Sequence, residues 1–174
     1  FQQSANKAIV DGLIAYGERR GFKGASGRID PVLHDSTDKR IIELQKFPGV
    51  SNLQPVMVLR PGGDAIEILT STGIHKSLSS DSWRWTNKSP SQLLHPGDVV
   101  YLFKAETGAR LANIPKVQGA LVSLSPSDGS ILALTGGFSF RQSRFNRVTQ
   151  AQRQPGSNIK PFIYSSAIAN GFTA

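Results

Sequence analysis

The sequence contains no cysteine and no long hydrophobic run, and both absences exclude classes of protein. Without thiols the chain can form no disulfide, no thiolate nucleophile and no cysteine-based zinc site. A membrane-spanning helix needs ~18 or more consecutive apolar residues, and no stretch approaches that length. The histidines have no metal-ligand spacing, so we expect neither a metal nor another cofactor; they are His34, His75 and His95. The chain begins with Phe1 and has no signal peptide, which indicates an excised piece whose membrane anchor would lie upstream.

Acidic residues are scarce. The 12 Asp and Glu face 20 Lys and Arg, which gives a net charge of +8 and a pI of about 10.1. Such a surplus favours anionic surroundings, such as nucleic acid, anionic lipid or an acidic polymer. A solvated basic surface without a dedicated partner explains it equally well. With 174 residues, the chain is long enough for one ordinary domain or two small ones.

The first half of the chain changes from helical to strand periodicity. Apolar residues recur with helical spacing over 4–20, where Ser4 can cap the helix and Gly21 can end it. A second short helix is expected over 31–47. From Leu53 onward apolar residues alternate in five candidate strands, which are 56–59, 65–69, 74–78, 99–103 and 109–114. Short strands at this density predict a small β-barrel of the OB type.

Trp83 and Trp85 lie two residues apart, so we expect them on one face of the barrel. We interpret them as core residues or a groove wall rather than a stacking platform.

A second hairpin follows Pro115. Strands 119–124 and 130–134 flank 126–129, where an early Pro and a late Gly suit a type I turn with a left-handed residue. The Gly136-Gly137 pair ends the second strand. A polar, Arg-rich connection then leads to Pro155-Gly156-Ser157, where a final helix is expected to start.

Ser157 and Lys160 form an S-x-x-K pair at the start of this helix. Their spacing places both side chains on one face, one turn apart. A serine hydroxyl needs a neighbouring base to become a nucleophile, and a neutral lysine can be that base. The spacing also leaves open that Ser157 is a plain helix cap. The same spacing at Ser4/Lys7 and Ser36/Lys39 is interpreted as non-catalytic.

Four arginines of the connection lie near Ser157 in sequence. They could receive substrate carboxylates, but a solvated or salt-bridged loop is the preferred interpretation; they are Arg141, Arg144, Arg147 and Arg153.

The segment 119–171 resembles the opening of the transpeptidase domain of class A penicillin-binding proteins, in the 1A-like branch of Gram-negative bacteria. The matching runs are 118–122, 131–134, 136–138, 145–147, 149–151, 153–157 and 160–164. S-x-x-K is a known signature of these enzymes. The earlier chain resembles, less strongly, the linker that leaves the glycosyltransferase domain and the OB-like insert of this branch.

The resemblance implies an α+β protein with three parts. They are a helical linker over 1–49, an OB-like β-barrel over 50–115, and over 116–174 the first hairpin and nucleophile helix of a penicillin-binding/β-lactamase-like transpeptidase domain. In such an enzyme Ser157 attacks D-Ala-D-Ala stem peptides and β-lactams, and Lys160 is the base. The family's S-x-N and K-T-G motifs do not follow Lys160 here, so we expect them on a downstream segment.

The implied partners are peptidoglycan stem peptides, the lipid-linked precursor, a covalent β-lactam and a regulatory lipoprotein on the OB-like insert. No nucleic acid is expected. The implied location is the periplasmic face of the bacterial inner membrane. The alternatives are an OB-type module that binds single-stranded nucleic acid, a docking module for a regulator, and a β-lactamase, against which the linker and insert argue.

Overall fold

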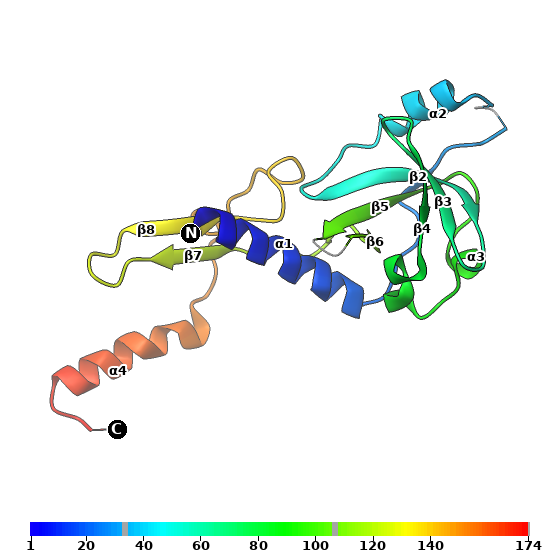
Figure 1. The fold of residues 1–174 in the computed structure, drawn as a ribbon. Helices are drawn as coiled ribbons and strands as arrows, with labels where there is room; N and C mark the ends of the chain where they lie inside the picture. Colours follow the sequence, from blue (N-terminus) through cyan, green and yellow to red (C-terminus); the bar gives the residue numbers. More distant parts are fainter. Residues whose placement is uncertain (33–34, 106–107, 174) are drawn as a thin grey trace.

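The computed structural model describes residues 1–32, 35–105 and 108–173. These residues form a six-stranded sheet, a separate two-stranded hairpin and four α-helices (Figure 1), which confirms the α+β class. The helices are α1 (Gln2–Arg19), α2 (Thr37–Leu44), α3 (Pro90–Leu93) and α4 (Lys160–Ala169). The strands are β1 (Gly27–Arg28), β2 (Leu53–Pro61), β3 (Ile66–Thr70), β4 (His75–Leu78), β5 (Asp98–Ala105), β6 (Gly108–Ala112), β7 (Leu121–Leu124) and β8 (Ile131–Thr135). None of the helices described is long and apolar enough to span a membrane.

The large sheet does not close into the barrel that the sequence predicted. Its antiparallel order is β1-β5-β2-β3-β4, with β6 paired to β5. In the described residues β4 and β6 do not pair. Instead the Ser82 hydroxyl donates to the carbonyl of Ala109 at 2.8 Å, and the Trp85 indole N–H donates to that of Leu111 at 3.0 Å. Carbonyls two residues apart point to the same edge of a strand. The Ser82 and Trp85 side chains therefore bind the carbonyl groups on the edge of β6 where a strand that closed the barrel would have paired.

Trp83 and Trp85 do not lie on a strand, as their spacing suggested. They belong to two consecutive 3₁₀ turns, η1 (Ser80–Ser82) and η2 (Arg84–Thr86), with Trp83 between the two. Trp83 is 5% exposed in the main core cluster, and Trp85 packs against the same cluster. The expectation that the pair is core rather than a stacking platform is confirmed.

Helix α1 lies across both sheets (Figure 1). Val10 and Ile14 are buried one helical turn apart and join a cluster that includes Tyr101 and Phe103 from β5. Phe138, which follows β8, is buried in the same cluster. One apolar stripe of one helix therefore joins the hairpin to the large sheet.

The ends of α1 differ in part from the sequence prediction. The helix already starts at Gln2, with Phe1 as its N-cap, so Ser4 is inside the helix and caps nothing. Gly21 has a φ of 79° just beyond the C-terminal end, which confirms it as the stop.

The first turns of α1 are tied to β8 by side-chain amides. Gln2 Nε2 donates to the carbonyl of Leu134 at 2.9 Å, and Gln2 Oε1 accepts from the N–H of Leu134 at 3.0 Å. The Thr135 hydroxyl donates to Asn6 Oδ1 at 2.6 Å. The Gln2 amide thus pairs with the edge of β8 as a neighbouring strand would, and fixes the helix relative to the hairpin.

The last turn of α1 is tied to β6 by an ion pair. Arg110 Nε lies 2.9 Å from Glu18 Oε1, and the guanidinium also lies over the Phe103 ring. Both atoms of the pair are buried and have no hydrogen-bond partner among the described residues. Burial raises the pKa of Glu18, and the nearby Arg110 charge offsets part of that shift.

The segment between α1 and β2 packs on the large sheet. Strand β1 pairs with β5, and Ile29 and Leu44 are buried in a cluster with Met57 of β2. The helix expected over 31–47 is shorter: α2 covers Thr37–Leu44, and the Ser36 hydroxyl caps it by accepting from the N–H of Lys39. The division between linker and insert at residue 50 stays a prediction.

We predict that Gln2→Ala speeds hydrogen exchange at the amide of Leu134, because that N–H loses its acceptor. Exchange at amides far from Leu134 should change little, because one hydrogen bond contributes only about 0.5–1.5 kcal/mol to the free energy of unfolding. Amide exchange followed by NMR measures it. Gln3→Ala is the matched control, because Gln3 is also exposed on α1 and makes no hydrogen bond with β8. Equal protection of Leu134 in Gln2→Ala and the native chain would show that the amide pair does not hold the strand.

We also predict that Glu18 makes the free energy of unfolding fall as pH rises above 4.5, its usual pKa. The folded chain keeps a proton on Glu18 at pH values where the unfolded chain has released it, so rising pH through this window favours unfolding. Glu18→Gln removes the titration, and the native-minus-variant difference should therefore decrease across the window. Urea unfolding at a series of pH values measures this. Gln3→Ala, an exposed change on the same helix that alters no titrating group, should leave the pH dependence as in the native chain. A native-minus-variant difference that grows with pH would contradict the prediction.

Candidate functional site

The hairpin that precedes the candidate site forms where the sequence predicted it. β7 and β8 are antiparallel, with Val122 opposite Leu134. Gly129 has a φ of 74°, and its N–H donates to the carbonyl of Ser125. The expected left-handed residue therefore sits at the end of the turn, where glycine avoids the steric cost of a Cβ.

The connection after β8 folds back on the Gly136-Gly137 pair. The N–H of Arg147 donates to the carbonyl of Gly136 at 3.0 Å. A Cβ at Gly136 would overlap with the side-chain oxygen of Asn146. The Asn146 N–H donates to Gln150 Oε1 at 2.6 Å, which holds the next turn of the connection. The glycine pair is thus a place of close chain approach as well as a strand end.

The side chain of Arg147 serves this loop. Its guanidinium donates to the carbonyl of Phe145 at 3.0 Å and, at longer range, to that of Gly136 and to the Ser143 hydroxyl. Arg144 lies over the Phe140 ring, at 5.7 Å from its centroid. Arg141 and Arg153 are exposed. Arg147 therefore acts as a hydrogen-bonding anchor of the loop, in line with the structural interpretation of these arginines.

The helix expected at Ser157 begins where predicted, as a 3₁₀ turn. η3 covers Gly156–Ile159 and continues into α4. Gly156 has a φ of 52°, which turns the chain into the helix. The N–H of Lys160 donates to the carbonyl of Ser157. In a 3₁₀ turn the side chains at i and i+3 eclipse, so Ser157 and Lys160 lie on one face of the turn.

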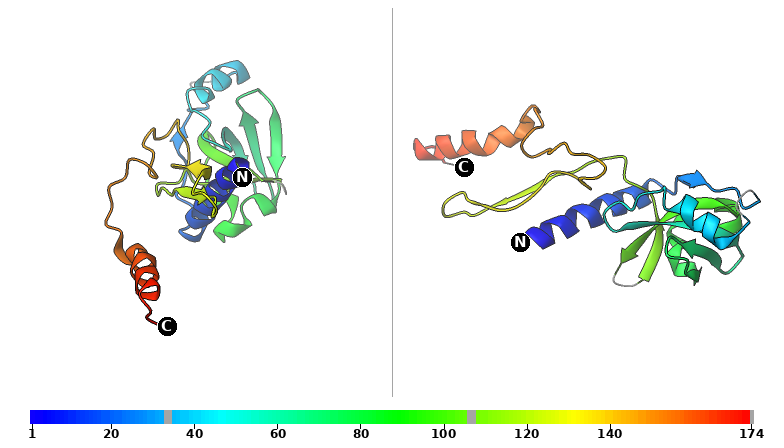
Figure 2. Two further views of the ribbon diagram at one scale, coloured as in Figure 1. Left: turned by 90° about the vertical axis from the view of Figure 1, so that its left-hand side faces the viewer. Right: turned by 90° about the horizontal axis from the view of Figure 1, so that it is seen from above.

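Ser157 and Lys160 are both exposed, as is most of α4. α4 stands clear of both sheets (Figure 2). Its large apolar side chains face solvent: Phe162 is 72% and Ile168 is 65% exposed. The turn that contains Ser157 therefore belongs to a helix that lacks a packing partner within the described residues.

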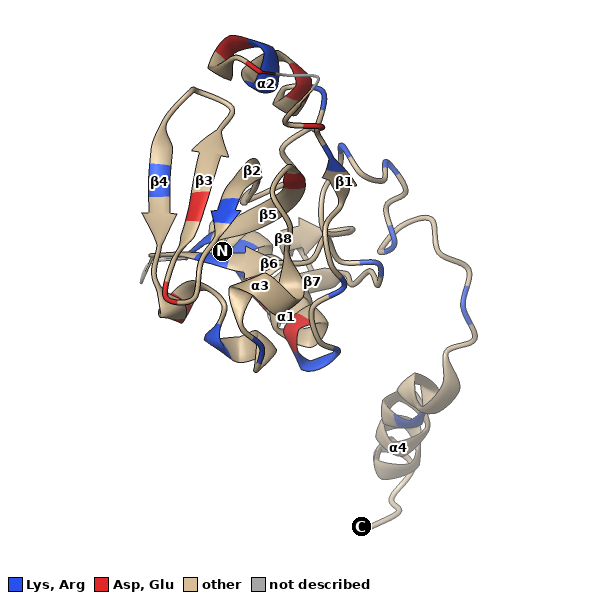
Figure 3. Ribbon diagram, turned by 90° about the vertical axis from the view of Figure 1, so that its right-hand side faces the viewer, with Lys and Arg blue, Asp and Glu red and all other residues tan. Residues whose placement is uncertain are grey.

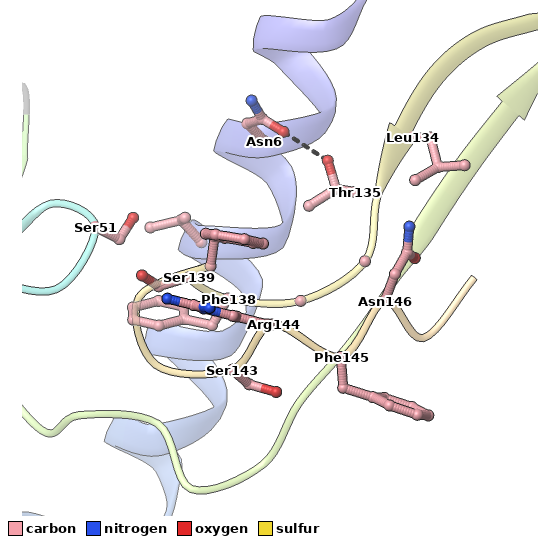
Figure 4. Close-up of a pocket in the computed structure, with 14 residues that line it drawn as sticks. Asn6, Ser51, Leu134, Thr135, Phe138, Ser139, Ser143, Arg144, Phe145 and Asn146 are labelled. Atoms are coloured by element: carbon pink, nitrogen blue, oxygen red, sulfur yellow. Dashed lines mark hydrogen bonds between the residues drawn. The ribbon is translucent and has the colours of Figure 1, made fainter. Parts of the chain in front are cut away.

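Two cavities lie beside the hairpin and the connection that follows it. The residues that line them do not include Ser157 or Lys160. The first, of about 480 Å³, lies between α1 and the connection after β8, and Figure 4 shows the Asn6–Thr135 hydrogen bond, Phe138 and Arg144 at its wall. The second, of about 650 Å³, lies between the start of β7 and the stretch 151–153. The S-x-x-K pair is thus an open turn and not the floor of a pocket.

No group of three His, Asp or Glu side chains able to hold a metal is found in residues 1–32, 35–105 and 108–173. His75 is exposed on β4. His95 is exposed, with its Nδ1 3.8 Å from Asp98 Oδ2. His34 lies outside the described residues.

Sequence reasoning missed the polar side chains that position this region. Gln118 Oε1 accepts from the N–H of Phe138 at 3.2 Å, and Gln2 and Asn6 hold β8. The amides of Gln2 and Asn6 lie four residues apart on one helix face, a signal that the sequence contains. Their partners are about 130 positions away, so spacing alone could not identify their role.

Two family models match the chain. That of the penicillin-binding protein OB-like domain matches residues 22–117, and that of the penicillin-binding protein transpeptidase domain matches residues 119–174. Penicillin-binding protein 1A from Pseudomonas aeruginosa is 37% identical over 187 residues, which is 100% of this chain and 22% of the relative. The protein of the same name from Escherichia coli K12 is 33% identical over 99% of this chain and 22% of its own length.

A solved structure agrees with these matches. The crystal structure of penicillin-binding protein 1A from Haemophilus influenzae superposes with a TM-score of 0.86 at 35% identity, over 99% of this chain and 26% of that one. The chain thus spans about a fifth of the length of the curated relatives. It belongs to the class A penicillin-binding proteins of the 1A branch, with their OB-like domain and the beginning of their transpeptidase domain.

Proposed function

We propose that this chain carries the nucleophile of a peptidoglycan DD-transpeptidase, and that the nucleophile is Ser157. The observation that carries the proposal is the position of Ser157. It lies in the first turn of the helix that ends the matched transpeptidase segment, exposed and one turn before Lys160. A hydroxyl in this place is accessible to a peptide substrate.

The proposed reaction has two stages. Ser157 Oγ attacks the penultimate D-alanine carbonyl of a stem peptide while Lys160, in its neutral form, takes the hydroxyl proton. The tetrahedral intermediate then collapses, the peptide bond breaks, and the terminal D-alanine leaves with the proton that Lys160 took from Ser157. In the second stage an amino group of a neighbouring stem attacks the ester, the bond between the acyl carbon and Ser157 Oγ breaks, and Oγ recovers a proton from the attacking amine. A β-lactam enters the first stage as a mimic of D-Ala-D-Ala, and the opened ring stays as an ester on Ser157.

The backbone around Ser157 offers one of the donors that this chemistry needs. An acyl-transfer site stabilises the oxyanion with preorganised N–H groups, and we assign one of them to Ser157 itself. We place the second donor, and the S-x-N and K-T-G motifs, on a segment downstream of residue 174. The exposed apolar residues of α4, such as Phe162 and Ile163, support this, because apolar surface of this extent in a soluble domain normally packs against another element.

The wider assignments rest on the family. We propose that the whole protein also has glycosyltransferase activity in an upstream domain, and that its substrates are the lipid-linked precursor and stem peptides. We further propose a location at the periplasmic face of the inner membrane, with the anchor upstream, and a regulatory lipoprotein on the OB-like domain. Nucleic acid is not proposed as a partner, since Trp83 and Trp85 are committed to the core.

We predict that penicillin acylates Ser157 alone, and only when the downstream segment is present. Losing one oxyanion donor can slow such a reaction about 10²–10³-fold, so residues 1–174 alone should label negligibly. In the full-length protein Ser157→Ala should abolish labelling, and Lys160→Ala should nearly abolish it because the base is lost. Mass spectrometry of the penicillin-treated protein locates the adduct.

Ser4→Ala and Lys7→Ala are the matched controls, because they have the same spacing on α1 and should label fully. An adduct on another serine, or full labelling of Lys160→Ala, would overturn the mechanism.

A further inference from the structure

A groove of about 520 Å³ lies between the C-terminal end of α1 and the segment that leaves β6. Residues 16–17, 20 and 23–26 form one wall, and residues 113–117 form the other. We call it the basic groove, after the cations at its rim: Arg20, Lys23 and Lys116. Neither Ser157 nor any residue of the connection that leads to it lines this groove.

The two walls are held together by one side chain. Asn113 Oδ1 accepts from the N–H of Lys23 at 2.9 Å, and Asn113 Nδ2 donates to the carbonyl of Gly21 at 3.0 Å. The Asn113 amide thus bonds one backbone N–H and one backbone carbonyl of the opposite wall, as the backbone of a paired strand would. The groove is therefore formed before any ligand arrives, which lowers the entropic cost of binding.

The cations of the groove lack acidic partners. Arg20, Lys23 and Lys116 are exposed, and none of them forms an ion pair with a carboxylate in the described part of the chain. No acidic residue is among those that line the groove. Glu18, on the last turn of α1, is engaged by Arg110 on β6. Figure 3 shows basic segments at the C-terminal end of α1. The groove is thus positively charged, and no carboxylate among its lining residues neutralises that charge.

The lining between these cations is partly apolar. Ile114 and Pro115 line the groove, and Val117 is 40% exposed beside them. Tyr16 contributes its ring, but the guanidinium of Arg20 lies 5.2 Å and that of Arg19 5.8 Å from the ring centroid. The ring is therefore already occupied by cations and is not free for base stacking, which argues against single-stranded nucleic acid. A flat lipid surface would not reach a recessed apolar lining.

We propose that the basic groove is a docking site for an acidic segment of a partner polypeptide that carries an aliphatic side chain between its carboxylates. The carboxylates bind Arg20, Lys23 and Lys116, and the aliphatic side chain packs on Ile114 and Val117. The volume suits such a short segment, since ligand pockets of about 300–1,000 Å³ are the usual range. The proposal is independent of the chemistry at Ser157.

The test uses the full-length protein and a short fluorescein-labelled peptide with Glu residues on both sides of a central Leu. Fluorescence anisotropy measures its dissociation constant at physiological salt. The double variant Lys23→Glu/Lys116→Glu should weaken binding about tenfold or more, a change of one decade in Kd. A peptide with Lys in place of Glu should bind this variant better than it binds the native protein. Replacing the central Leu by Ser should also weaken binding, because the apolar contact is lost.

Lys76→Glu/Lys88→Glu is the matched control. Both lysines are exposed on the large-sheet domain and outside the groove, and the pair changes the net charge equally. It should leave the dissociation constant within about twofold. Acylation of Ser157 by penicillin should be the same in both double variants, so failure of the docking proposal is distinguishable from failure of the proposed function.

Three results would sink the proposal. They are no binding of the acidic peptide to the native protein, equal weakening by the control pair, and insensitivity to the Leu-to-Ser change, which leaves a bare anion site. A stronger dependence on Lys23 and Lys116 for anionic vesicles or single-stranded DNA than for the peptide would assign the groove to that other partner instead.

Discussion

Helix α1 packs one apolar stripe against two sheets that share no strand. Val10 and Ile14 contact a cluster that contains Phe103 of the large sheet and Phe138 after the hairpin. Polar contacts fix both ends of the helix, through Gln2 on β8 and Glu18 on β6. The apolar contact supplies the attachment, because buried apolar area is the main source of stability. The polar contacts fix the position of the helix relative to the two sheets, because hydrogen bonds and ion pairs form only at particular distances and angles.

The region after the hairpin depends on this attachment. The loop at Gly136 is held by Arg147, whose N–H and guanidinium donate to the carbonyl of Gly136, and it follows directly on the strand that Gln2 contacts. The chain then leaves the body of the molecule, and Ser157 is presented on a helix without a packing partner in the described residues. The turn at Ser157 is thus built by local geometry, through the positive φ of Gly156 and the 3₁₀ hydrogen bond of Lys160. Ser157 and Lys160 are exposed there and do not line either of the two cavities beside the hairpin.

Charge is distributed unevenly over the fold. Arg110 forms an ion pair with Glu18, whereas Arg20, Lys23 and Lys116 at the basic groove form no ion pair among the described residues. A partly buried pair loses part of its solvation and gains attraction where the surroundings are less polar than water. The unpaired cations keep their field in solvent, which attracts anionic groups. Three of the basic residues, Arg20, Lys23 and Lys116, therefore lie together at the basic groove.

The sequence by itself determined the local elements. Alternating apolar residues predicted the strands, Gly21 and Gly129 marked ends and turns by their freedom at positive φ, and the Pro-Gly-Ser start predicted the helix at Ser157. Each of these depends on neighbours within a few positions. Only the tertiary structure decided that the barrel stays open, with Ser82 and Trp85 at the edge of β6, and that α1 joins the two sheets. Those contacts link residues about 26 to 130 positions apart, as in Trp85–Leu111 and Gln2–Leu134. Local spacing contains no information about such partners, because the chain brings them together only when the apolar faces pack.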